Sequence, residues 1–147
     1  MFGICFGDQA LAKALGGEVI ESPTGWSLGT VAVHICATAP WMTPARDALN
    51  LYAVHNEIVA RLPEGATAFA ETDRNKFAGF YVGDHILTTQ HHPEMTSEFV
   101  MDVVEGLASV LDPAVIERAR ESLATQADSD VFAEWISRFF EAAQMAV

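Results

Sequence analysis

The first residues whose types could support catalysis are a cysteine flanked by glycines, in the stretch Gly3-Ile4-Cys5-Phe6-Gly7. A strand-to-helix turn of this composition, a nucleophile elbow, strains its central residue, and small flanking residues let the chains approach closely. The following helix would point its N-terminus at the sulfur, so we expect a lowered thiol pKa. The backbone N–H of Phe6 would face a developing oxyanion. The pattern predicts Cys5 as a nucleophile, although a glycine-flanked cysteine also occurs as a small core residue.

A cysteine nucleophile needs a base, and His92-Pro93-Glu94 supplies a histidine and a carboxylate two residues apart. Pro93 keeps the backbone at His92 extended, so the imidazole is expected to project from the end of a strand. The carboxylate of Glu94 would fix the imidazole tautomer, as in a catalytic triad. A lone loop histidine is also explained by solvent or by a structural hydrogen bond. The two patterns together favour covalent catalysis.

Both motifs lie at the carboxyl ends of predicted strands, where α/β sheets place their sites. Residues 1–4 end a strand, and residues 9–15 have helical apolar spacing before the Gly16-Gly17 stop. Further strands are predicted at 18–20, 30–35, 49–54, 67–70, 77–82 and 86–90. A loop at 39–45 is predicted to begin a short helix near Pro44, and longer helices are predicted at 97–111, 113–125 and 128–145. The sequence predicts one α/β domain over 1–147, with the motifs in about 1–100 and C-terminal helices in 97–147.

The composition argues against several classes of protein. With 20 acidic and 8 basic side chains the net charge is −12, which disfavours nucleic acid or an anionic membrane as partner. Hydrophobic residues make up 50% and charged residues 19%, which argues against disorder. Charged residues from Asp8 to Glu21 interrupt the apolar N-terminal region, so neither a membrane span nor a signal peptide is expected. Two cysteines form no disulfide framework, and we expect a cytoplasmic protein.

Longer stretches around the two motifs resemble class I (triad) glutamine amidotransferase domains. That family shares G-x-C-x-G-x-Q, a helix ending in Leu-Gly-Gly, and Q-x-H-P-E about eighty to ninety residues later. The matching stretches here are residues 3–12, Leu15-Gly16-Gly17 and Gln90-His91-His92-Pro93-Glu94. Val54-His55-Asn56-Glu57 and residues 62–66 resemble the family's histidine-containing strand end and the turn after it. Residues 25–29 and 83–87 look most like stand-alone, GMP-synthase-like members and the related γ-glutamyl peptidases.

The resemblance implies a flavodoxin-like fold and attack by a thiolate on the side-chain amide of glutamine. A γ-glutamyl thioester forms, ammonia leaves, and water releases glutamate. When the catalytic roles of the family are assigned to the matching positions, the resemblance implies that Cys5 is the nucleophile, His92 the acid/base and Glu94 the orienting carboxylate. It places the substrate against four further residues: the backbone of Phe6, then Gln9, His55 and Asn56. It implies no cofactor or metal, a glutamine or γ-glutamyl small molecule as ligand, and a synthetase partner or a homo-oligomer.

Some nearby residues allow other interpretations. Asp8 stands where many family members have His or Met, and His91 occupies the variable position of Q-x-H-P-E as a neighbour of the base. His85, His91, His92 and Glu94 could be taken for a metal cluster, but adjacent histidines on a strand point to opposite faces. No helical His-x-x-x-His pair accompanies them, so we expect no zinc site.

Three other features are expected to be structural. Cys36 is predicted to be a buried strand thiol, and Trp26 either lines a pocket mouth or packs. The last helix carries an apolar stripe with helical spacing, which predicts core contact: Phe132, Trp135, Ile136, Phe139 and Phe140.

The family's fold begins upstream of the elbow, with units that include a glycine-rich turn donating a second oxyanion N–H. At about 30 residues per βαβ unit, we expect two or three units, about 60–90 residues, to be absent before Met1. We therefore expect little glutaminase activity from these 147 residues alone. The alternatives are an inactive family member serving as a folding or interaction module, a γ-glutamyl peptidase, and a dienelactone-hydrolase-like enzyme. The last gives no reason for Q-x-H-P-E.

Overall fold

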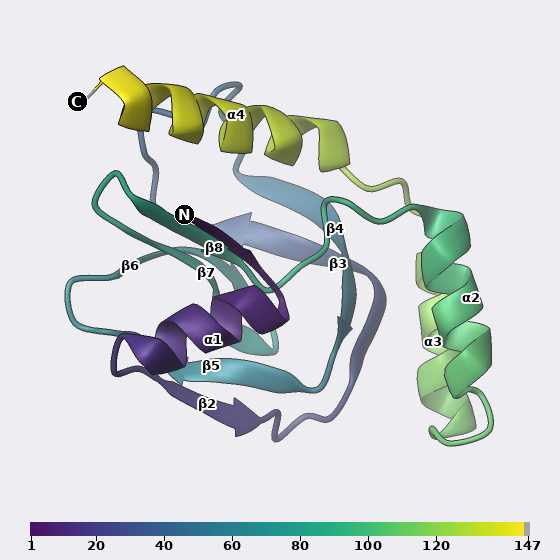
Figure 1. Cartoon of the computed structure of the whole chain (residues 1–147). Coiled ribbons are helices and arrows are strands. Elements are labelled where there is room, and N and C mark those ends of the chain that lie inside the picture. Colours follow the sequence, from purple (N-terminus) through teal and green to yellow (C-terminus); the bar gives the residue numbers. More distant parts are fainter. Residues whose placement is uncertain (146–147) are drawn as a thin grey trace.

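The computed structural model describes residues 1–145, which form eight strands and four helices (Figure 1). In chain order the elements are β1 (Phe2–Ile4), α1 (Phe6–Ala14), β2 (Glu18–Glu21), β3 (Ser27–Ile35), β4 (Ala48–His55), β5 (Glu57–Arg61), β6 (Thr67–Thr72), β7 (Asn75–Val82), β8 (Ile86–Thr89), α2 (Ser97–Leu107), α3 (Pro113–Ser122) and α4 (Ser129–Met145). Six strands form one sheet in the order β1-β8-β7-β6-β3-β4, and β2 pairs with β5. The predicted α/β class is confirmed.

The directions of the strands gather several carboxyl ends at one edge of the sheet. β1 and β8 are parallel, with Gly3 opposite Thr88, and the other neighbouring pairs are antiparallel. β1, β8, β6 and β4 therefore run in the same direction. The sheet also curls, so that Tyr52 of β4 bridges His92 just beyond β8, although β4 and β1 are its opposite edges. The curl brings the end of β4 to the ends of β1 and β8.

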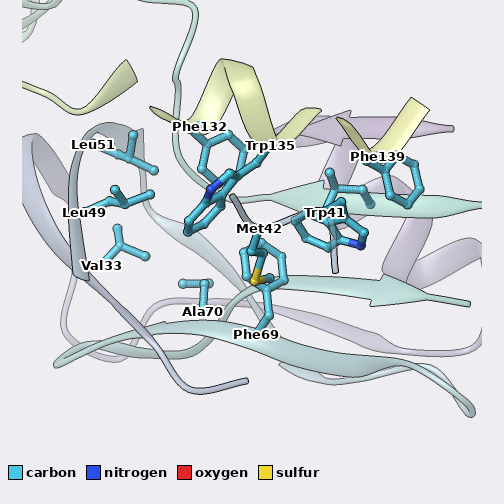
Figure 2. Packing of buried hydrophobic residues seen from close by; sticks show 12 residues of the cluster. Val33, Trp41, Met42, Leu49, Leu51, Phe69, Ala70, Phe132, Trp135 and Phe139 are labelled. Carbon is cyan, nitrogen blue, oxygen red and sulfur yellow. The ribbon is translucent and has the colours of Figure 1, made fainter. Parts of the chain in front are cut away.

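Helix α4 covers one face of the sheet with aromatic side chains (Figures 1 and 2). The indole of Trp41 lies at the centre of this core, edge-to-face with Phe69 at 5.7 Å between ring centroids. The helix buries three residues of the predicted stripe: Phe132, Trp135 and Phe139. Ile136 is partly buried against the same cluster, whereas Phe140 is 41% exposed. The predicted core role of the stripe is confirmed for all but Phe140.

The other helices pack elsewhere on the molecule. α1 lies against β5, β7 and β8, where Ala12, Val59 and Phe80 are buried. α2 and α3 pack beside β3 and β4 around a smaller cluster that includes Val104 and Ile116. No helix within residues 1–145 is both long and apolar enough to span a bilayer.

Two local predictions are wrong, and one strand was not predicted. No helix begins near Pro44; the segment is a loop that buries Trp41 and Met42, and Pro44 O accepts a hydrogen bond from Trp135 Nε1. Cys36 follows the end of β3 and is exposed, because the strand stops one residue earlier. The sequence did not predict β5, which forms because the chain after β4 turns back to pair with β2.

Candidate active site

β1 ends in a sharp turn at Cys5, the one non-glycine residue within 1–145 with a positive φ (φ 50°, ψ −101°). Such a backbone conformation costs on the order of 1–3 kcal/mol and persists only where surrounding contacts hold it. One of those contacts is the Cys5 N–H, which donates to Thr89 O at 2.8 Å and extends the β1–β8 pairing into the turn. α1 begins at the next residue. The predicted strand-to-helix elbow is confirmed.

Only one of the two glycines beside Cys5 is required by close packing. A Cβ at Gly3 would lie 2.7 Å from the backbone carbon and oxygen of Gly7 and 2.8 Å from Leu11 Cδ1. A Cβ at Gly7 would meet no atom within 4 Å. Gly3 therefore lets the first turn of α1 lie directly against β1.

The thiol of Cys5 is half-buried and forms hydrogen bonds to β4 and to Gln90. Its Sγ donates to Val54 O at 3.9 Å and accepts from Gln90 Nε2 at 3.5 Å, and the His92 imidazole is not a partner. Burial raises the pKa of Cys5, more than the hydrogen bond from the Phe6 N–H lowers it. The expected lowering of the thiol pKa at the helix N-terminus is therefore wrong, because loss of hydration outweighs it.

His92 and Glu94 form a close pair. The His92 N–H donates to Tyr52 O at 2.9 Å, which fixes the residue beside β4. His92 Nδ1 lies 2.6 Å from Glu94 Oε1, with the imidazole 11% and the carboxylate 48% exposed. A carboxylate only accepts, so this contact favours a proton on Nδ1 and leaves Nε2 as the free acceptor.

β4 holds both halves of the site. Tyr52 O accepts the hydrogen bond from His92, and Val54 O, two residues on, accepts the one from Cys5 Sγ. Carbonyls two residues apart on a strand point to the same edge. Two motifs that are far apart in the sequence are thus brought to one edge of a single strand.

A hollow of about 190 Å³ opens beside Cys5. Its lining includes three predicted substrate-contacting residues, Gln9, His55 and Asn56, together with Trp26, Val54 and Glu57. The Phe6 side chain is 79% exposed and lines a second hollow, of about 500 Å³, where α1 meets β2 and β5. Only the backbone of Phe6 faces the thiol. Trp26 lines the Cys5 hollow, one of the two interpretations that the sequence left open.

The segment that contains Trp26, on one side of the Cys5 hollow, is held by hydrogen bonds from Arg74, in the turn between β6 and β7. Arg74 Nε donates to Thr24 Oγ1 at 3.0 Å and Arg74 Nη1 donates to Trp26 O at 3.0 Å. A third hydrogen bond joins its Nη2 to Thr24 O. Sequence reasoning missed Arg74, since no motif includes it.

Gln90 is the second residue that sequence reasoning missed, although it is the first residue of the Q-x-H-P-E motif. It is fully buried beneath Cys5. Gln9 Nε2 donates to Gln90 Oε1 at 3.2 Å and to Glu57 O at 2.9 Å. A chain of amide hydrogen bonds therefore runs from the thiol to the backbone of β5.

Two buried histidines, His55 and His91, lie close to this series of amide hydrogen bonds. His55 Nδ1 lies 3.1 Å from Glu57 O, and the His55 ring meets His91 edge-to-face at 5.8 Å between centroids. Burial lowers the pKa of His55 to about 4 and that of His91 to about 3. Both are neutral at pH 7, and of the adjacent pair only His92 meets a carboxylate.

Asp8, in the first turn of α1, is a buried acid near the thiol. Neither carboxylate oxygen has a hydrogen-bond partner, and burial raises its pKa to about 7. When ionised, it would raise the thiol pKa further. Within the described residues 1–145, no group of three or more His, Cys, Asp or Glu side chains is placed to hold a metal ion.

Comparison with known proteins identifies the family. A model of the class-I glutamine amidotransferase family matches residues 1–101. The chain belongs to this family. A glutamine amidotransferase-like protein of Schizosaccharomyces pombe is 31% identical over 139 residues, which cover 93% of this chain and 56% of that protein.

Relatives in the amidotransferase family bear two other names. A GMP synthase (glutamine-hydrolyzing) of a Shewanella species is 28% identical over 88% of this chain and 28% of its own length. Gamma-glutamyl peptidase 2 of Arabidopsis thaliana is 25% identical over 84% of this chain and 52% of its own. The chain thus spans about half the length, or less, of the curated relatives it matches.

The fold of this amidotransferase-family chain is also found among solved structures. A Thermoplasma acidophilum protein described as a GMP synthase component superposes with a TM-score of 0.67 at 21% identity, covering 99% of this chain and 59% of that one. The predicted fold, that of class I glutamine amidotransferases, is confirmed.

Proposed function

We propose that this chain hydrolyses the side-chain amide of glutamine with Cys5 as nucleophile, His92 as acid/base and Glu94 as the orienting carboxylate. The observation that carries the proposal is the arrangement at β4. There the strained Cys5 elbow and the His92–Glu94 pair are bound to carbonyls two residues apart. Membership of the amidotransferase family supports the same chemistry.

The first step is attack by sulfur. Because burial raises the Cys5 pKa, the resting group is the thiol, and its proton must leave before attack. The free Nε2 of His92 accepts that proton when substrate brings the two groups together. The sulfur electron pair forms a bond to the amide carbon, and the carbonyl π pair moves to oxygen. The Phe6 N–H stabilises that oxyanion.

The second step releases ammonia. As the tetrahedral intermediate collapses, the C–N bond breaks and the protonated imidazole gives its proton to the leaving nitrogen. Glu94, 2.6 Å from Nδ1, stabilises the imidazolium until that transfer. Water, deprotonated by His92, then attacks the γ-glutamyl thioester, and glutamate leaves as the Cys5 sulfur takes back a proton.

The site also bears on the size of the substrate. The Cys5 hollow, at about 190 Å³, is smaller than the 300–1,000 Å³ usual for drug-sized ligands, which favours a compact amide such as glutamine. A γ-glutamyl peptide is the second candidate. It is favoured by the larger hollow along α1, which shares Gln9 and Glu57 with the first and offers room for a longer leaving group.

An inactive interaction module is the other alternative. It is favoured by the protonated thiol and by the lack of a hydrogen bond between Cys5 and His92. If the chain is active, it releases ammonia that a synthetase could use. The relatives named GMP synthase support a synthetase as partner, and a homo-oligomer is the alternative assembly.

The test is labelling by a glutamine-analogue diazo-ketone, which traps the nucleophile in a single turnover, together with ammonia release from glutamine. We expect the label on Cys5 and not on the exposed Cys36, as peptide mass mapping would show. His92→Asn should slow labelling at least 10²-fold, since it removes the base. His34→Asn, at an exposed position on β3, is the matched control and should change nothing.

The outcomes separate the alternatives. Labelling of Cys36 alone, or equal labelling of both thiols, would exclude Cys5 as the nucleophile. Labelling of Cys5 without any ammonia release would favour the interaction module. Faster release of amine from a γ-glutamyl dipeptide than of ammonia from glutamine would favour the peptidase.

A further inference from the structure

We infer that Gln90 positions the sulfur of Cys5 and stabilises its thiolate, and that Gln9 orients the Gln90 amide for this task. The inference rests on the proposed role of Cys5 as nucleophile. It gives Gln9 a role besides the expected contact with substrate.

The Gln90 side chain has a defined place beneath the nucleophile. Its backbone N–H donates to Ala78 O at 2.9 Å, which continues the pairing of β8 with β7 beyond Thr89. Its side-chain Nε2 donates to Cys5 Sγ at 3.5 Å, within the longer range of hydrogen bonds to sulfur. The residue has no exposed surface, so water does not compete for this contact.

Gln9 determines which way the Gln90 amide faces. The Gln9 Nε2 has two hydrogens, and the structure gives it two acceptors, Glu57 O at 2.9 Å and Gln90 Oε1 at 3.2 Å. If the Gln90 amide were reversed, two N–H donors would face each other and the sulfur would face an oxygen. The backbone carbonyl of Glu57 therefore fixes Gln9, and Gln9 fixes Gln90.

The direction of this chain matters for the charge on sulfur. Gln9 Nε2 donates to Gln90 Oε1, and Gln90 Nε2 in turn donates to Cys5 Sγ, so the series ends with an N–H directed at the sulfur. A hydrogen bond to a charged group is worth more than one to its neutral form. The Gln90 amide therefore favours the thiolate and opposes the effect of burial.

The test measures the pH dependence of Cys5 alkylation by iodoacetamide, followed for each cysteine by peptide mass. Gln90→Met keeps the length of the side chain and removes the donor. We expect the midpoint of the pH dependence of Cys5 alkylation in this variant to lie about one to two pH units above the midpoint in the unsubstituted protein. Gln90→Glu should shift the midpoint at least as far, because a carboxylate then faces the sulfur. Gln126→Met, the same change at an exposed position, should shift nothing.

Cys36 serves as an internal reference, because Gln90 does not contact it and its midpoint should stay constant in every variant. An unchanged Cys5 midpoint in Gln90→Met with native circular dichroism would overturn the inference. If that variant does not fold, Gln9→Met gives the answer. It leaves Gln90 in place without its orienting donor, so a smaller upward shift supports the inference and no shift overturns it.

The alkylation assay is independent of turnover, so two failures can be told apart. A shifted midpoint in a chain that releases no ammonia supports the positioning role and contradicts the proposed glutaminase. Ammonia release by the unsubstituted chain, together with an unshifted alkylation midpoint in Gln90→Met, supports the proposed glutaminase and contradicts the positioning role of Gln90.

Discussion

The two glycines of the elbow should respond oppositely to the same substitution. In Gly3→Ala the new methyl group would lie 2.7 Å from the backbone of Gly7, which cannot move unless the first turn of α1 moves with it. Overpacking of this kind typically costs about 1–3 kcal/mol of stability. In Gly7→Ala the methyl group meets no atom within 4 Å, and alanine in a helix is about 0.5–1 kcal/mol better than glycine.

The effect on reactivity should follow the same pattern. A displacement of α1 moves the Phe6 N–H and Gln9 relative to the sulfur, and a misplacement of about 1 Å can cost about 10²-fold in rate. We expect Gly3→Ala to lose most diazo-ketone labelling of Cys5 and Gly7→Ala to retain it.

The assays are urea unfolding followed by tryptophan fluorescence, and labelling of Cys5 with Cys36 as the reference. The difference between the two variants in free energy of unfolding should be about 1.5–4 kcal/mol, with Gly3→Ala the less stable. Equal stabilities, or a less stable Gly7→Ala, would refute the argument that β1 and α1 meet through Gly3.

Two further substitutions test the buried titratable groups by urea unfolding at several pH values. Burial lowers the pKa of His91 to about 3, so below about pH 6.5 the unfolded chain binds a proton that the folded chain does not, and stability falls. His91→Phe should remove up to about 2 kcal/mol of the stability lost between pH 7 and pH 5, and an unchanged pH slope would contradict the burial of a neutral imidazole. Burial raises the pKa of Asp8 to about 7, so its contribution to stability is lost as pH rises from about 4 through 7. Asp8→Asn should gain up to about 4 kcal/mol over the parent between pH 4 and pH 8, and a constant difference would show that Asp8 is solvated.

The sequence indicated the candidate residues Cys5, His92 and Glu94 because the patterns that mark them are local. The elbow follows from a cysteine between small residues, and the His92–Glu94 contact follows from two residues on either side of a proline. Both are properties of a few consecutive residues, so they need no knowledge of tertiary contacts.

The errors concern quantities set by distant contacts. The thiol pKa depends on how far β4 and Gln90 exclude water from Cys5, which the motif does not contain. The Arg74 contacts join residues about fifty positions apart, and no pattern marks them. Cys36 was misplaced because it directly follows the last strand residue, Ile35, where neighbouring elements and not the strand pattern decide whether a side chain is covered.

The strained turn at Cys5 has a consequence for affinity. Its φ of 50° is held by contacts with neighbouring segments, among them the hydrogen bond from the Cys5 N–H to Thr89 O at 2.8 Å. Opening of the turn would release the strain, so the population of the closed turn depends on how far these contacts outweigh it. A ligand in the Cys5 hollow binds only the closed fraction, so its apparent affinity is reduced by that fraction. Any contact that stabilises the closed turn would strengthen binding without touching the ligand.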